Sequence, residues 1–318
     1  MSRLKKERLS QGRLFIPIIF SFGCVLEDMP FKEFLGDPTK VSNALRTIQN
    51  YFHVDGVVCY ADKILMAEAL GCHPHWSVSP PSIEPLTKIP EELESRIGTA
   101  LQEGRLNTAV EVTKRLNALL PDTILMCSVS GPLTLARQLA GISPLEVFDH
   151  RDLLGQATKA ILAFSKALGN VGIDLLLFSE EELPPLDERS LKALRRCYSP
   201  IWNTAKFYNI SPLLTVERFS VQNVGPLSTI VDGLVLPATG SFEKLEQLTR
   251  RSFALPVSLL EQEPEKIEAF LSRSAIGGTA KFPSFFLLTT DSEVPKTINK
   301  EFMIRGVQTV RDFLKRQS

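Results

Sequence analysis

The chain has 318 residues, of which 44% are hydrophobic and 23% charged, and its basic and acidic residues balance to a formal net charge of zero. These proportions are typical of a soluble globular protein, and the charge balance argues against nucleic acid or an anionic membrane as a partner. No apolar stretch reaches the ~18 residues that a membrane span needs. Five widely spaced cysteines without a Cys-x-x-Cys pair argue against a disulfide framework and predict a cytoplasmic protein.

Eight short apolar runs, separated by segments with helical spacing, are the most informative feature of the sequence. They are Phe15–Phe20, Val57–Tyr60, Ile124–Val129, Leu175–Phe178, Pro212–Val216, Gly233–Leu236, Val257–Leu260 and Phe285–Leu288. Strands that alternate with helices pair in parallel, so eight such units predict a single-domain (β/α)8 barrel over residues 13–318. Residues 1–12 are expected to form a polar lead-in.

The segments between the runs carry helix signals. Helices are predicted over about 38–51, 64–70, 91–104, 108–120, 153–169, 187–208 and 299–316, with three more that begin near Gly131, Phe242 and Pro264. Pro200 lies within one of them and predicts a kink or a boundary. The segment Cys72–Pro90 holds five prolines and is expected to be an irregular excursion over one end of the barrel.

Polar and acidic residues follow nearly every apolar run. In a (β/α)8 barrel the active site lies at the carboxyl ends of the strands, so these positions are candidate site residues. They include Asp62, Ser128, Ser130, Glu180, Glu217, Asp291 and Ser292. Converging carboxylates raise one another's pKa and suit acid–base catalysis or the binding of a cation. The alternative explanation is that the same residue types cap helices at strand–helix junctions.

Three segments resemble the uroporphyrinogen decarboxylase superfamily, which includes the haem-pathway decarboxylase and many corrinoid-dependent methyltransferases. They are Asp55–Gly71, Ser130–Ala136 and Phe285–Pro295. The resemblance implies a (β/α)8 barrel, in agreement with the strand count. It also implies that Asp62 occupies the position of the decarboxylase's catalytic aspartate, which contacts the pyrrole nitrogens of the substrate.

The sequence departs from both branches of that superfamily. The arginine-rich segment that binds substrate carboxylates in the decarboxylase corresponds here to Ile16–Gly23, which has no arginine. The zinc ligands of the better-known methyltransferases correspond to Thr215, Glu217 and Ser292, so three sulfur or imidazole ligands are missing. The resemblance therefore predicts no zinc site, and Glu217 with Asp291 remains as an oxygen-donor alternative for a metal.

The leading hypothesis is corrinoid-dependent methyl transfer, in which a small methylated substrate is demethylated. Asp62 would be the catalytic acid or orienting group. The substrate-binding residues would be Phe20, Phe22, Gly131, Pro132, Glu180, Glu217 and Ser292. No cofactor is expected on this chain alone, because the corrinoid would be carried by a separate protein that docks over the mouth, and a homodimer is expected from the resemblance. The alternatives are decarboxylation of a porphyrinogen or another carboxylated substrate, and a catalytically silent binding subunit.

Overall fold

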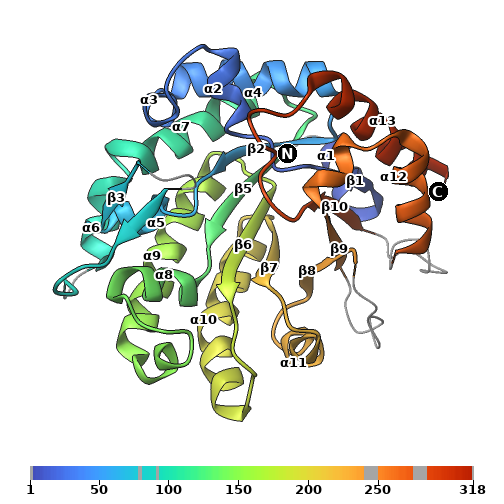
Figure 1. The fold of residues 1–318 in the computed structure, drawn as a ribbon. Helices are drawn as coiled ribbons and strands as arrows, with labels where there is room; N and C mark the ends of the chain where they lie inside the picture. Colours follow the sequence, from blue (N-terminus) through green and yellow to red (C-terminus); the bar gives the residue numbers. More distant parts are fainter. Residues whose placement is uncertain (1–2, 78–80, 91–92, 240–249, 275–284, 317–318) are drawn as a thin grey trace.

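Eight parallel strands form a nearly closed barrel that is surrounded by helices in the computed structural model (Figure 1). The structure describes residues 3–77, 81–90, 93–239, 250–274 and 285–316. The strands are β1 (Arg13–Phe15), β2 (Gly56–Ala61), β5 (Ile124–Ser130), β6 (Leu175–Glu182), β7 (Ser211–Arg218), β8 (Gly233–Pro237), β9 (Arg250–Leu255) and β10 (Phe286–Thr290). Their order is β1-β10-β9-β8-β7-β6-β5-β2, so the predicted (β/α)8 architecture is confirmed.

The barrel closes between β1 and β2 through Asp55, the residue before β2. Its backbone N–H donates to the Phe15 carbonyl at 3.2 Å, and its carboxylate accepts from the Phe15 N–H at 2.9 Å. The same carboxylate binds the guanidinium groups of Arg8 and Arg311 at 3.0 and 3.2 Å. One side chain thus joins the two ends of the sheet to the first and last helices of the chain.

Two predicted strands were wrong, the first in its limits and the seventh in its position. The first strand is Arg13–Phe15 rather than Phe15–Phe20, because Pro17 has no N–H to continue the ladder after Ile16. The seventh strand is β9 rather than Val257–Leu260. That apolar run follows Pro256 and forms the 3₁₀ helix η4 (Val257–Glu261), which packs against the last helix.

The helices occupy the predicted intervals. The longer ones are α4 (Pro38–Phe52), α6 (Leu93–Ala100), α7 (Gly104–Leu119), α8 (Pro132–Ala140), α9 (Arg151–Asn170), α10 (Glu188–Phe207), α12 (Pro264–Arg273) and α13 (Lys300–Arg316). The shorter ones are α2 (Phe22–Leu26), α3 (Phe31–Phe34), α5 (Leu65–Ala69), α11 (Val224–Ser228), η1 (Glu146–Asp149) and η2 (Val221–Asn223). Helix α10 runs through Pro200 without ending there. The helix predicted to begin at Phe242 lies outside the described residues.

The polar lead-in contains a helix, α1 (Arg3–Gln11), which packs against the barrel. Its Lys5 side chain is 1% exposed and its ammonium lies 2.9 Å from the Asp174 carboxylate. Asp174 precedes β6 and also accepts from the Leu125 N–H of β5 at 2.9 Å. The buried Lys5 in the first turn of α1 therefore connects this helix, through Asp174, to strands β5 and β6.

Two apolar layers stabilise the fold. The barrel interior contains alternate residues of the strands, among them Leu14, Val58, Met126, Leu177 and Leu287. The intervening residues pack outward against the ring of helices and form the larger cluster. This alternation determines which polar residues at the strand ends face the mouth, because successive side chains of a strand point to opposite faces.

The proline-containing segment Cys72–Pro90 is more regular than predicted. It contains the antiparallel pair β3 (His73–His75) and β4 (Ser82–Glu84). Both histidines are exposed or nearly so, and His75 lies 3.7 Å from Glu84 across the pair. None of the described helices is long and apolar enough to span a bilayer.

Candidate active site

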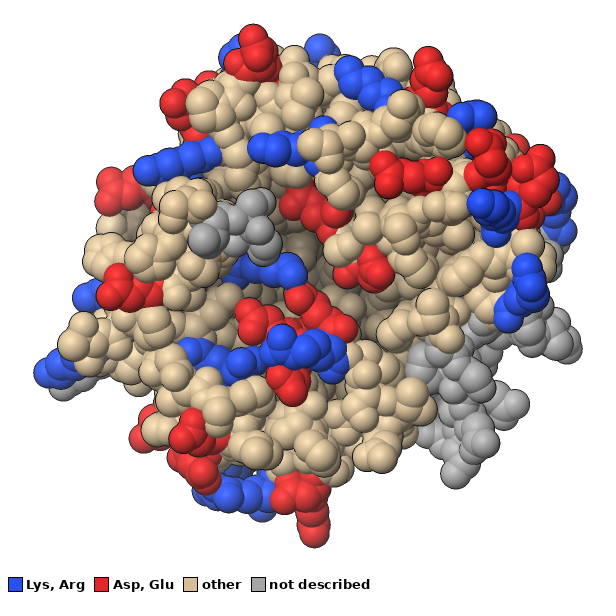
Figure 2. Space-filling view, in the orientation of Figure 1, with Lys and Arg blue, Asp and Glu red and all other residues tan. Residues whose placement is uncertain are grey.

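Polar side chains from four neighbouring strands, β2, β5, β6 and β7, and from helix α8 meet at the carboxyl ends of the strands. They line one small cavity of about 10 Å³ and comprise Asp62, Lys63, Ser128, Ser130, Thr134, Ser179, Glu181 and Glu217. A volume of this size is near the lower limit for one water molecule. Figure 2 shows a hollow near the centre of this face with acidic and basic side chains gathered around it.

Strand alternation explains which residues reach the mouth. In β6, Leu175 and Leu177 face the barrel interior, and Ser179 and Glu181 continue the same inward series. In β2 the pairing with β5 shifts register between Val58 and Tyr60, which changes the alternation just before Asp62. The bulge therefore sets the direction of the strand end that carries the predicted catalytic aspartate.

Asp62 lies at the mouth and is paired with an arginine. Its carboxylate forms an ion pair with the Arg105 guanidinium, and it also accepts from the Ile64 N–H at 3.0 Å. The same guanidinium pairs with Glu68 and stacks on the Trp76 ring at 5.0 Å. Both partners of the Asp62–Arg105 pair are largely buried, so the aspartate is held in one orientation.

Arg105 was not predicted from the sequence. It lies in the first turn of α7, more than forty residues after Asp62, and no spacing or motif connects the two. Its partner Trp76 comes from the proline-containing segment. That segment therefore contributes to the surroundings of the predicted catalytic aspartate through the Trp76–Arg105 contact.

A second ion pair lies beside the first. The Lys63 ammonium is 2.7 Å from the Glu217 carboxylate, which also accepts from the Ser179 hydroxyl at 3.2 Å. The Lys63 backbone carbonyl accepts from the Ser130 hydroxyl at 2.8 Å and from the Gln138 amide at 3.1 Å. The structure thus brings Glu217 into the same cluster as Asp62, as the sequence predicted for the strand ends.

Glu293 is an acidic residue at the mouth that sequence reasoning missed. It follows β10 by three residues and accepts a hydrogen bond from the Ser21 N–H. Burial raises the pKa of Glu293, the nearby Asp62 carboxylate raises it further, and the Ser21 hydrogen bond and Lys63 oppose these effects. A carboxyl group with a raised pKa next to a paired aspartate keeps its proton to higher pH than an ordinary glutamate, which suits it to proton transfer.

Glu180 does not lie at the mouth. It points outward from β6 into the core and is completely buried. Its carboxylate accepts from Leu133 N–H, Thr134 N–H, Thr134 hydroxyl and Tyr198 hydroxyl at 3.2, 2.7, 2.7 and 2.6 Å. Burial raises its pKa and these hydrogen bonds oppose that effect. Its four donors join β6 to the start of α8 and the middle of α10.

Gly131 and Pro132 form the start of α8, next to Glu180. A Cβ atom at Gly131 would lie 2.3 Å from the Glu180 carboxyl group, so only glycine fits there. The Gly131 N–H donates to the Ser179 carbonyl at 2.7 Å. These two residues therefore position the strand end that carries Ser179 and Glu181 at the mouth, and neither of them lines the mouth cavity.

Phe20 and Phe22 are buried in an aromatic cluster outside the barrel. The Phe20 ring lies 5.0 Å from Tyr60 and 5.8 Å from Phe34, and Phe22 lies 5.7 Å from Phe52. The Tyr60 hydroxyl donates to the Leu35 carbonyl at 2.8 Å. The structure does not bring these phenylalanines together with the mouth cluster.

Asp291 and Ser292 lie at the exposed exit of β10. The Ser292 hydroxyl donates to Asp291 at 2.9 Å, and the same carboxylate oxygen accepts from the Val257 N–H at 3.1 Å. In the described part of the chain, no three His, Cys, Asp or Glu side chains are arranged to hold a metal ion. The donor set Thr215, Glu217 and Ser292 offers only oxygen, so it does not fit the zinc site of the corrinoid methyltransferases.

Two further ion pairs lie at the strand ends. Arg137 lies 3.5 Å from Glu181, and Arg218 lies 2.7 Å from Glu182. Four basic side chains thus lie at or near the mouth with a carboxylate partner each: Lys63, Arg105, Arg137 and Arg218. Because Arg105 is shared by two carboxylates and Glu293 has no cation within ion-pair distance, the described mouth is acidic on balance.

Comparisons with known proteins agree with this architecture. The uroporphyrinogen decarboxylase family model matches residues 17–177, slightly more than half of the 318 residues. The chain belongs to the uroporphyrinogen decarboxylase family. Family membership assigns it to an enzyme superfamily. Comparison with curated protein sequences gave no match.

Solved structures share the fold over nearly the whole chain. A methyltransferase from Methanosarcina mazei is similar with a TM-score of 0.74 and 19% identity, covering 98% of this chain and 96% of that protein. A protein described as a B12-independent methionine synthase of Listeria monocytogenes has a TM-score of 0.59 and 11% identity, covering 96% and 97%. One from Shewanella has a TM-score of 0.56 and 11% identity, covering 90% of each. At these identities the likeness shows the fold.

Proposed function

We propose that this family member transfers a methyl group from a small neutral or cationic methylated donor to a corrinoid. The observation that carries the proposal is the charge of the mouth. Its basic side chains, Lys63, Arg105, Arg137 and Arg218, are each neutralised by a carboxylate. A carboxylate-rich substrate needs paired cations in such a site, because unpaired buried charge is costly. A methoxyaromatic or a methylated amine has no such need. The methyltransferase among the structural neighbours supports the same class of reaction.

The corrinoid would be held by a partner protein. The cavity inside the mouth has room for about one water molecule, so a macrocycle must lie above the rim. When bound there, the corrinoid supplies the acceptor for the methyl group, and the electron pair of the broken bond stays on the donor's oxygen or nitrogen. What remains for this chain is to hold the donor and to provide a proton for the demethylated group.

Glu293 and Asp62 divide these tasks in the proposal. Glu293 carries the proton, because burial raises its pKa and keeps its carboxyl protonated to higher pH. Asp62 is fixed by Arg105 and the Ile64 N–H and orients the donor through its carboxylate. The Lys63–Glu217 pair lines the same small cavity as Asp62 and limits the size of the group that enters.

A catalytically silent binding subunit is the second candidate. The observation that favours it is the small volume of the mouth cavity, together with the engagement of Asp62 by a strong partner. In that case a partner protein would dock on this face without any turnover. The same assay separates the two candidates.

The test is methyl transfer to cob(I)alamin, followed by the absorbance change of the corrinoid, with methoxyaromatics and methylated amines as donors. The wild type should turn over at least one donor class, and Asp62→Asn should reduce kcat/KM by roughly a hundredfold, the order of loss expected when a substrate-positioning group no longer holds its geometry. Asp122→Asn is the matched control, because Asp122 is an exposed aspartate in the turn before β5. Turnover unchanged by Asp62→Asn would refute the assigned role, and no turnover with any donor would favour the silent subunit.

A further inference from the structure

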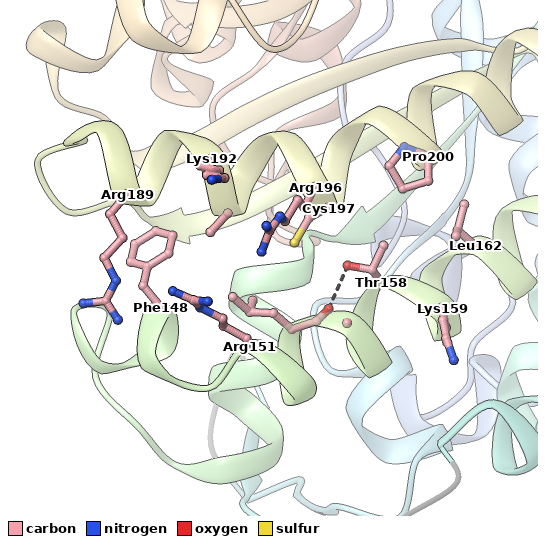
Figure 3. A pocket seen from close by; sticks show the side chains of 13 residues that line it. Phe148, Arg151, Thr158, Lys159, Leu162, Arg189, Lys192, Arg196, Cys197 and Pro200 are labelled. Atoms are coloured by element: carbon pink, nitrogen blue, oxygen red, sulfur yellow. Dashed lines mark hydrogen bonds between the residues drawn. The ribbon is translucent and has the colours of Figure 1, made fainter.

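A groove on the outer surface of the barrel, between α9 and α10, has the features of a ligand site. Its volume is about 330 Å³, within the range of roughly 300–1,000 Å³ that small-molecule sites occupy. Its floor is buried and largely apolar, formed by Phe148, Leu154, Thr158 and Cys197. Figure 3 shows the two helices on either side and the lining side chains between them.

Two arginines face each other across this groove. Arg151 begins α9 and Arg196 lies in the middle of α10, and both extend their guanidinium groups into the space between the helices (Figure 3). Neither has an ion pair or hydrogen bond to another side chain in the described part of the chain. Two unpaired guanidinium groups repel each other, and an anion placed between them relieves that repulsion.

The two ends of the groove differ in character. Arg189 lines the end near Phe148 and is itself paired with Asp149. Leu162 and Pro200 lie at the other end, where Lys159 also lines the groove (Figure 3). The positive end of the 20-residue helix α9 is also at the arginine end and adds to the attraction for an anion. A ligand that fits this polarity has an acidic head and an apolar body.

The groove is also kept open by residues that a helix does not favour. Gly155 lies within α9, where glycine costs about 1 kcal/mol relative to alanine. No atom lies within 4 Å of a Cβ built at Gly155, so packing does not require a glycine at that position. Pro200 lies within α10 and removes one helical hydrogen bond. Both unfavourable residues line the same groove.

We infer that this groove binds a small amphipathic anion, an aromatic or short aliphatic body that carries a carboxylate, sulfonate or phosphate group. The head binds between Arg151 and Arg196, and the body lies over the floor toward Leu162 and Pro200. The site is separate from the mouth cluster, since none of its lining residues lines the mouth cavity. It is therefore independent of the proposed methyl transfer.

The experiment uses two fluorescent probes with the same ring system. 8-Anilinonaphthalene-1-sulfonate has an acidic head, and N-phenyl-1-naphthylamine lacks it. The wild type should bind the sulfonate at about one equivalent and at least tenfold more tightly than the neutral amine. Arg151→Gln with Arg196→Gln should remove that preference. Arg195→Gln is the matched control, because Arg195 lies on the same helix but donates to Thr229 outside the groove.

Gly155→Leu is a second variant that tests the groove even if the arginine variants fail to fold. Leucine is a better helix former than glycine and its side chain would fill the groove, so sulfonate binding should be lost in a folded protein. Equal binding of both probes, or sulfonate binding that survives Gly155→Leu, would overturn the proposal. Sedimentation with phosphatidylglycerol vesicles tests whether the groove binds a membrane surface instead of a free anion. Vesicle binding that needs both arginines, with no probe binding, would replace the small anion by a membrane surface.

Discussion

Replacing Glu180 by glutamine tests whether this buried carboxyl group is a structural link between β6, α8 and α10. Two donors point at each carboxylate oxygen, Leu133 N–H and Tyr198 hydroxyl at one and the Thr134 N–H and hydroxyl at the other. Glutamine places an NH₂ group where two donors already point. The Tyr198 hydroxyl can rotate to accept, but the Leu133 N–H cannot. One buried donor is left unsatisfied, which costs about 1–3 kcal/mol.

The pH dependence of that difference has a definite sign. Burial raises the pKa of Glu180 above its ordinary value of 4.5. A carboxyl whose pKa is higher in the folded than in the unfolded state stabilises most below the unfolded pKa, and this contribution is lost as the pH rises through the folded pKa. The advantage of wild type over Glu180→Gln in free energy of unfolding should therefore be largest near pH 4 and should decline toward pH 8.

Denaturant unfolding followed by tryptophan fluorescence measures both effects, because the Trp202 ring lies 5.5 Å from the Tyr198 ring that binds Glu180. Tyr198→Phe serves as a comparison that removes one donor and leaves the carboxyl group. An unfolding difference that grows with pH would refute the reasoning, since it would mean that the hydrogen bonds outweigh burial and hold the pKa of Glu180 below its ordinary value.

Three further outcomes follow from the structure. Lys5→Met should destabilise the fold by roughly 3–5 kcal/mol by leaving Asp174 buried without its cation, and Lys5→Met with Asp174→Asn should recover most of the loss, as a double-mutant cycle of denaturant unfolding would show. The described cysteines are all buried, and burial raises the pKa of Cys59 to about 12 and of Cys72 and Cys197 to about 11. A thiol reagent at pH 8 should therefore react slowly with the native protein and fully after denaturation, and rapid native labelling would contradict the burial. If Glu293 carries the proton, activity should fall as the pH rises through its raised pKa, and a pH–rate profile of Glu293→Gln that keeps this limb would exclude the residue.

The sequence predicted the barrel because apolar runs and helical spacing are local signals. It failed where local signals compete. Strand β1 ends before Pro17, although the apolar run continues to Phe20. Strand β9 begins with polar residues and was not recognised as a strand, whereas the apolar run after Pro256 was assigned as one and is a 3₁₀ helix. The first error displaced the limits of a strand and the second assigned a strand to a neighbouring 3₁₀ helix, but neither changed the predicted topology.

The site was predicted in part. Asp62 and Glu217 meet at the mouth because carboxyl ends of parallel strands share one rim, which is a consequence of topology. Glu180 was placed on the wrong side, although two-residue alternation from Leu175 and Leu177 would have assigned Ser179 and Glu181 to the mouth. No local pattern identifies Arg105, since its contact with Asp62 depends on how α7 packs.

The charge preference of the methyl donor tests the central claim most directly. Anisole and 4-methoxybenzoate present the same methoxy group and differ by one carboxylate, so the ratio of their kcat/KM values for methyl transfer to cob(I)alamin reports the charge of the mouth. Each basic residue at the strand ends already has a carboxylate partner, so the benzoate carboxylate would find no free cation there, and anisole should be favoured by about tenfold or more, which corresponds to roughly 1.4 kcal/mol. Preference for 4-methoxybenzoate would contradict an acidic mouth that acts on uncharged or cationic donors.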